Sequence, residues 1–201
     1  MTQFKALGLS DPITSSLITM GYEKPTPIQE ITIPQILGSN QDLKAFAQTG
    51  TGKTAAFSLP IIEKIDLSRK HAQALILSPT RELAIQIARN IEEFSQNMKE
   101  LKVTAVYGGA NIDEQIRSLR RGTQIVVGTP GRTLDLVKRK ALSLEKIQWL
   151  VLDEADEMLK MGFKEELDKI LRSTPKEKQT HQYSATFPKE VEQISTNYLQ
   201  E

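Results

Sequence analysis

The sequence contains no cysteine, which excludes a disulfide framework and any cysteine-ligated metal site. Neither sign of charge is in excess, because 26 Lys and Arg face 25 Asp and Glu. Any nucleic-acid contact must therefore come from a local patch or from backbone groups. No window holds the roughly 20 apolar residues of a membrane helix, and residues 1–8 lack the features of a signal peptide. We expect a cytoplasmic protein with no membrane partner.

The chain alternates short apolar runs with longer amphipathic segments. The apolar runs at 74–77, 103–107, 125–127 and 149–152 are typical of strands buried on both faces, and further strands are expected at 40–47 and around Tyr183. Helices are expected at 10–21, 26–37, 53–67, 83–101, 112–121, 132–139, 164–172 and 188–199. This alternation predicts an α/β fold with a central, mostly parallel sheet and helices on both faces. A length of 201 residues fits one domain.

Residues 47–54 read Ala-Gln-Thr-Gly-Thr-Gly-Lys-Thr and lie between an expected strand and an expected helix. The glycines permit a tight loop whose N–H groups point at phosphate oxygens, and the helix adds its positive end. Lys53 would reach the outer phosphates and the Thr54 hydroxyl would bind Mg²⁺. The alternative is a Gly/Thr turn of the kind that precedes many helices. The predicted phosphate-binding residues are Gln48, Thr49, Gly50, Thr51, Gly52, Lys53 and Thr54.

An acidic segment, Asp153-Glu154-Ala155-Asp156, follows the apolar run that ends at residue 152. Asp153 can hold Mg²⁺ directly or through water, and Glu154 can orient and deprotonate an attacking water. The alternative is a polar helix cap after a strand. Combined with Lys53, the segment predicts nucleotide hydrolysis, with Lys53, Asp153 and Glu154 as catalytic residues and Thr54 and Asp153 as metal ligands.

Several segments, in order along the chain, resemble the motifs of the DEAD-box RNA helicases, whose name the sequence of 153–156 spells. The others are 21–29 with the upstream Phe4, 79–84, Gly108-Gly109, 129–132 and 184–186. The match extends from Phe4 to about Leu199. It implies a RecA-like P-loop domain, with residues 1–37 as the N-terminal Q-motif region and 38–201 as the P-loop core.

The resemblance implies that ATP, with Mg²⁺, is the nucleotide. Gln29 would read the adenine edge through its amide, and Tyr22 would stack on the ring. Without the resemblance, Tyr22 reads as a core aromatic residue and Gln29 as a helix-surface residue.

The resemblance also implies an RNA site and a coupling network. One RNA strand would be lined by Pro79, Thr80, Arg81, Gly108, Gly109, Thr129, Pro130, Gly131 and Arg132. Hydroxyls, loop amides and arginines bind phosphates and sugars without reading bases, although 79–82 and 129–132 could also be simple helix starts. Ser184 and Thr186 would couple the two sites through hydrogen bonds to the segment that ends at Asp156. The alternative is a polar cap before the last helix.

Members of this family carry two RecA-like domains, and the sequence holds the motifs of the first only. The second, C-terminal domain would supply arginine fingers and the other half of the RNA groove, so we expect the isolated, monomeric domain to hydrolyse ATP poorly. The expected function is an ATP-dependent RNA helicase. The alternatives are a nonenzymatic, ATP-dependent RNA clamp or scaffold, and an ATPase acting on protein or DNA. Intact Glu154 argues against the clamp.

Two expected strands carry polar residues where family members place apolar ones: Lys44 in the first, and His181 and Gln182 in the last. Buried without partners, such residues would cost several kcal/mol. Natural variation, engineering and an incorrect register are the three explanations that the sequence leaves open.

Overall fold

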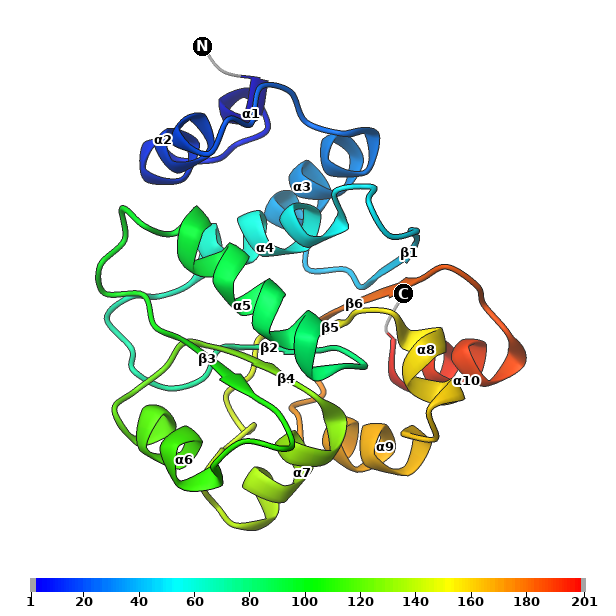
Figure 1. Ribbon diagram of the computed structural model, residues 1–201. Helices are drawn as coiled ribbons and strands as arrows, with labels where there is room; N and C mark the ends of the chain where they lie inside the picture. Colours follow the sequence, from blue (N-terminus) through cyan, green and yellow to red (C-terminus); the bar gives the residue numbers. More distant parts are fainter. Residues whose placement is uncertain (1–2, 200–201) are drawn as a thin grey trace.

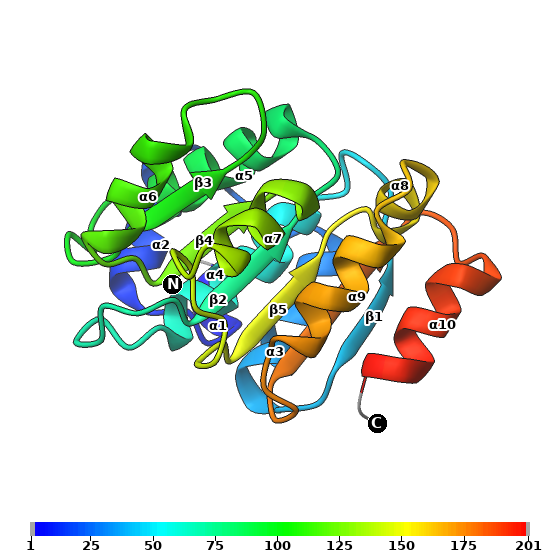
Figure 2. The same cartoon turned by 90° about the horizontal axis from the view of Figure 1, so that it is seen from below.

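A computed structural model describes residues 3–199 as one sheet between two layers of helices (Figure 1 and Figure 2). The strands are β1 (Leu43–Phe46), β2 (Ala74–Leu77), β3 (Val103–Val106), β4 (Ile125–Gly128), β5 (Trp149–Leu152) and β6 (Gln179–Ser184). The helices are α1 (Gln3–Ala6), α2 (Asp11–Thr19), α3 (Pro27–Gly38), α4 (Lys53–Lys64), α5 (Arg81–Phe94), α6 (Ile112–Arg120), α7 (Pro130–Lys138), α8 (Ala155–Lys160), α9 (Lys164–Arg172) and α10 (Lys189–Tyr198).

The sheet has the order β1-β6-β5-β2-β4-β3, and all five pairings are parallel. Parallel strands need long crossovers, and the helices between the strands provide them. The predicted α/β fold is confirmed. Because every strand points the same way, the segments that follow the strands all emerge at one edge of the sheet, its carboxyl edge.

Each face of the sheet packs against its own group of helices. Ile76 and Val151 point into a core formed with α2, α3, α4 and α5, whereas Leu75 and Leu150 point into a second core with α6 to α10. Figure 1 shows α1 to α5 above the sheet and α6, α7 and α9 below it. The strands are therefore apolar on both faces, which explains their unbroken apolar runs.

The structure differs most from the expected elements at two short helices and one helix end. Helices α1 and α8 were not expected, because four and six residues are too few to show a helical period. Helix α5 ends at Phe94 rather than near residue 101. The Ser95 hydroxyl donates to the Ile91 carbonyl at 2.7 Å where the helix ends. Leu101 is nevertheless buried, so the apolar spacing continued beyond the helix.

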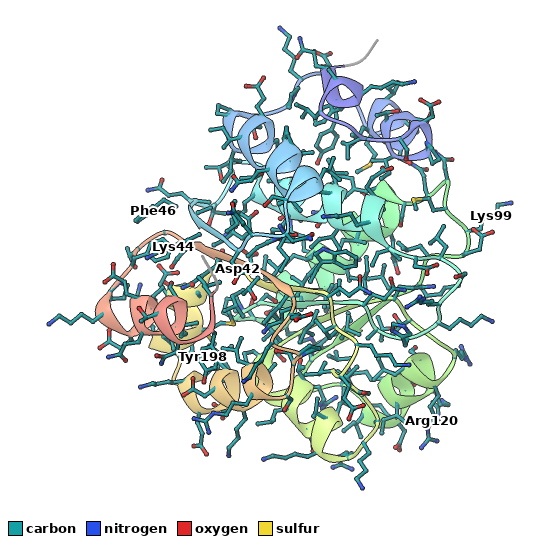
Figure 3. All side chains as sticks on the ribbon, turned by 180° about the vertical axis from the view of Figure 1, so that it is seen from behind. Asp42, Lys44, Phe46, Lys99, Arg120 and Tyr198 are labelled. Carbon is teal, nitrogen blue, oxygen red and sulfur yellow. The ribbon has the colours of Figure 1, made fainter. Side chains whose placement is uncertain are left out.

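Two of the unexpected polar residues are accommodated without an unpaired buried group. Lys44 lies on an edge strand with its side chain 35% exposed, its ammonium 3.9 Å from Glu192 and 4.3 Å from the centre of the Phe187 ring. Figure 3 shows Lys44 beside Phe46 at this edge. Gln182 is fully buried, but its amide donates to the Val191 carbonyl at 3.2 Å and accepts from the Ser195 hydroxyl at 2.7 Å. Helix α10 therefore gives both the nitrogen and the oxygen of the Gln182 amide a hydrogen-bond partner.

Of these three residues, His181 is the one whose polar atoms the fold does not satisfy. It is fully buried, and neither ring nitrogen has a hydrogen-bond partner among the described residues. Burial, and then the positive charge of Lys64, lowers the pKa of His181 from 6.5 to about 3. The ring is therefore neutral in the folded protein, and protonation is coupled to unfolding.

We predict that His181 makes the protein less stable in mild acid. Below pH 6.5 the His181 ring is protonated in the unfolded chain, whereas in the folded chain it stays neutral down to about pH 3. The free energy of unfolding therefore decreases as the pH is lowered from 6.5 to about 3. Relative to His181→Leu, the wild type should lose about 1 kcal/mol between pH 7.5 and 5.5. Urea unfolding at both pH values measures this gap. Asp153 titrates in the opposite direction but is present in both chains, so a gap independent of pH would contradict the assignment.

Candidate functional site

The carboxyl edge of the sheet divides the predicted site residues into two groups. The loop of residues 47–52 follows β1, the acidic segment 153–156 follows β5, and Ser184 ends β6. These neighbouring strands form one half of the edge, the P-loop half. The segments at 79–81, 108–109 and 129–132 follow β2, β3 and β4, which are neighbours in the other half, the Gly-Gly half.

The loop before α4 is shaped by its own backbone and by Gln29. The Thr51 hydroxyl donates to the Gln48 carbonyl at 2.7 Å, and Gly52 adopts a left-handed conformation with φ of 82°. The Gln29 amide donates to the Gly52 carbonyl at 3.0 Å and accepts from the Thr26 N–H at 3.0 Å. A side chain at position 52 would clash with Gln29 and Thr26, so glycine is required there for both conformation and space.

Lys53 connects this loop to the acidic segment. Its ammonium lies 3.1 Å from a carboxylate oxygen of Asp153 and 3.2 Å from one of Glu154. Asp153 is fully buried, and burial raises its pKa to about 6 against the opposing effect of the Lys53 charge. A buried ammonium between two carboxylates is held in place, because separating it from both leaves uncompensated charge.

The backbone of Glu154 is strained. Its φ of 53° and ψ of 52° place a non-glycine residue in the left-handed region, immediately before α8. Such a conformation costs about 1–3 kcal/mol and persists only where the surrounding structure enforces it. Here β5 fixes one side and α8 the other, and the result aims the Glu154 carboxylate at the Lys53 ammonium.

A cleft of about 350 Å³ opens beside Lys53 and Glu154. Tyr22 and Gln29 line it, as do Thr49, Gly50, Gly52 and Thr54. The Tyr22 ring is fixed by edge contacts with Phe4 and Phe94, whose ring centres lie 6.2 Å and 5.8 Å away. Burial, and then the nearby Glu93 carboxylate, raises the pKa of Tyr22. The cleft therefore offers an aromatic face and an amide next to the loop.

One wall of this cleft is formed by α5 and was not predicted from the sequence. Leu83, Gln86 and Asn90 line the cleft together with Thr26 and Ala55. Gln86 and Asn90 are four residues apart, which places both amides on one helix face. That spacing is visible in the sequence, but only the packing of α4 against α5 turns the face toward the loop.

The donor set fits a magnesium ion. Both carboxylate oxygens of Asp153 are buried without a hydrogen-bond partner among the described residues, although one of them is ion-paired with Lys53. The hydroxyl-bearing Thr54 and the Glu154 carboxylate line the adjacent cleft. No cluster of three or more His, Cys, Asp or Glu suited to a metal occurs within residues 3–199. Magnesium in nucleotide sites commonly uses only one or two carboxylates, and phosphate and water complete its shell.

Ser184 and Thr186 lie against Asp156. The Asp156 N–H donates to the Ser184 hydroxyl at 3.2 Å, and the Thr186 N–H and hydroxyl both donate to the Asp156 carboxylate, at 3.1 Å and 2.8 Å. Burial raises the pKa of Asp156, but the hydrogen bonds from Thr186 and Ser184 outweigh it, so the net shift is downward. The ends of β5 and β6 are thus joined by an ionised carboxylate.

In the Gly-Gly half, two of the segments begin helices. Thr80 precedes α5 and its hydroxyl accepts from the Leu83 N–H at 3.2 Å, while Pro130 is the first residue of α7. Both segments present helix N-termini at the edge of the sheet, which favours negatively charged ligands. Pro79 is buried, whereas Arg81, Gly108, Gly109 and Gly131 are exposed.

None of the helices within residues 3–199 is long and apolar enough to cross a bilayer.

The chain is 50% identical to the ATP-dependent RNA helicase DeaD of Klebsiella pneumoniae over 200 residues, which is all of this chain and 31% of that protein. It thus spans about a third of the length of the curated relatives it matches.

Two solved structures have the same fold. A crystal structure of a DEAD box protein from Methanococcus jannaschii matches with a TM-score of 0.95 and 43% identity, covering 100% of this chain and 55% of that one. The helicase Prp28 of Chaetomium thermophilum, bound to ADP, matches with a TM-score of 0.87 and 40% identity, covering 96% and 48%. The model of the DEAD/DEAH box helicase family matches residues 26–194, and the chain therefore belongs to that family.

Proposed function

We propose that this chain is the N-terminal RecA-like domain of an ATP-dependent RNA helicase, and that it binds ATP with Mg²⁺ in the P-loop half and one RNA strand in the Gly-Gly half. The observation that carries the proposal is the convergence of Lys53, Asp153 and Glu154 beside a cleft lined by Tyr22 and Gln29. The relatives are named RNA helicases, and one structural neighbour is described as bound to ADP.

Each residue of the P-loop half has a role in this proposal. Tyr22 and Gln29 hold the adenine, and the N–H groups of the loop bind the phosphates. Lys53 exchanges its two carboxylates for the outer phosphates, which frees Glu154 to accept a proton from the attacking water. Thr54 and Asp153 would hold the magnesium ion, which supplies positive charge against the phosphates. Asp156 keeps Ser184 and Thr186 in contact with this segment.

The Gly-Gly half and a second domain would complete the activity. One RNA strand would lie along the segments at 79–81, 108–109 and 129–132, held by its backbone. A C-terminal RecA-like domain of the same protein would close on ATP and RNA and supply arginine fingers, worth ~10³–10⁵ in rate. Its absence would leave the isolated, monomeric domain weakly active. We place the protein in the cytoplasm.

A clamp that binds RNA without hydrolysing ATP is a weaker alternative. A permanent clamp needs no group to activate water, yet Glu154 is held in a strained backbone conformation with its carboxylate 3.2 Å from Lys53. Strain at such a position is typical of functional residues.

We predict that Lys53→Ala strongly weakens nucleotide binding by this chain. Among residues 3–199, Lys53 carries the only ammonium that lines the cleft, and losing its charge-assisted bonds to phosphate should weaken affinity on the order of a hundredfold. Titration with a fluorescent ADP analogue measures this. Lys99→Ala is the matched control, because Lys99 is exposed at the far end of the molecule (Figure 3). Equal affinity of Lys53→Ala and wild type would refute the phosphate site.

We predict that Glu154→Gln retains bound ATP without hydrolysing it. The amide preserves the shape of the side chain but cannot accept the proton of the attacking water. Single-turnover conversion of labelled ATP, with protein in excess, detects even slow hydrolysis and should fall about 100-fold or more. Glu157→Gln is the control, since Glu157 pairs with the exposed Lys160 on α8. Unchanged conversion in Glu154→Gln would show that another group activates water.

A further inference from the structure

The exposed turn at Gly108-Gly109 lies between two arginines that come from different helices. The guanidinium of Arg81 stands 5.3 Å from the centre of the Tyr107 ring. It also lies 3.4 Å from the position that a side chain at Gly109 would occupy. At the other end of the turn, both terminal nitrogens of Arg132 donate to the Ala110 carbonyl at 3.2 Å. Two positive charges thus flank one turn.

Gln115 connects this turn to Arg132. It is 7% exposed, on the first half of α6, and both ends of its amide are used. Its oxygen accepts from Arg132 at 2.9 Å, and its nitrogen donates to the Tyr107 carbonyl at 3.1 Å. A buried amide with both ends bonded has one orientation, because reversing it would set donor against donor.

Tyr107 contacts Arg81 directly and is linked to Arg132 through Gln115. The Arg81 guanidinium lies over the Tyr107 ring, and the Tyr107 carbonyl accepts a hydrogen bond from the Gln115 amide. The oxygen of the same amide accepts a hydrogen bond from Arg132. This series of contacts therefore links three elements at the carboxyl edge of the sheet: the helix after β2 (Arg81), the turn after β3 (Tyr107) and the helix after β4 (Arg132). Each arginine uses only part of its planar set of N–H donors, so the rest can face a phosphate.

We propose that Tyr107 and Gln115 are positioning residues for RNA, which set the geometry of Arg81, Arg132 and the Gly108-Gly109 turn before the strand binds. This inference rests on the proposed RNA site. Neither residue lies in the segments that identified that site from the sequence. Exposed arginines and glycine turns lose conformational freedom on binding, so fixing them in advance strengthens binding by removing that cost.

The test compares RNA and nucleotide affinity in matched variants. Gln115→Met keeps the length of the side chain and removes both hydrogen bonds, so the affinity for a fluorescein-labelled ten-nucleotide single-stranded RNA should fall about tenfold. Affinity for a fluorescent ADP analogue and the melting temperature should stay close to wild type. Ser118→Met, on the same helix, is the control and should bind RNA as wild type does.

A second pair of variants tests Tyr107 independently. Tyr107→Leu removes the aromatic face under Arg81 and should weaken RNA binding about threefold, whereas Tyr107→Phe keeps the face and should bind normally. If Gln115 acts mainly through Arg132, then Arg132→Met with Gln115→Met should lose little more than Arg132→Met alone.

The outcomes separate this inference from the proposed function. If Arg81→Ala and Arg132→Met weaken RNA binding but Gln115→Met and Tyr107→Leu do not, the positioning role is wrong and the RNA site stands. If Gln115→Met weakens RNA and nucleotide binding equally and lowers the melting temperature, Gln115 has only a structural role. If the wild type binds no RNA at all, both the RNA site and its positioning residues are overturned.

Discussion

The ion pairs of Lys53 with Asp153 and Glu154 hold together the loop before α4 and the acidic segment 153–156, and the proposed nucleotide site depends on this contact. They join a loop after the edge strand β1 to a segment after the third strand of the sheet, 101 residues further along the chain. Asp153 is completely buried, and a charge there is tolerated only beside an opposite charge. The same pairs must open if phosphate is to reach Lys53. In the proposed function, the ATP phosphates must therefore compete with these two carboxylates for the Lys53 ammonium.

The parallel sheet explains why the two proposed ligands occupy separate halves. Strand order β1-β6-β5-β2-β4-β3 gathers the loop, the acidic segment and Ser184 on three neighbouring strands, and leaves the other three to Arg81, Gly108 and Arg132. Neighbouring β5 and β2 mark the boundary between the halves.

The sequence was sufficient for the fold class and the family, because both depend on local patterns. Unbroken apolar runs such as 149–152 predicted strands buried on both faces, and the ordered motifs predicted the family. Side-chain environments could not be predicted in the same way. Lys44 does not destabilise the fold because β1 is an edge strand and its ammonium can reach solvent. Gln182 does not destabilise it because α10 supplies two hydrogen-bond partners. Gln86, Asn90, Tyr107 and Gln115 acquire their places from helix packing and from contacts between strands that are distant in sequence.

A crystal structure of this chain with a nonhydrolysable ATP analogue and Mg²⁺ would show whether the Lys53 ammonium binds phosphate. We expect the Lys53 ammonium to leave Asp153 and Glu154 for the outer phosphates, with the metal in contact with Asp153 directly or through water and the adenine between Tyr22 and Gln29. A nucleotide bound elsewhere, with Lys53 still 3.1 Å from Asp153, would contradict it.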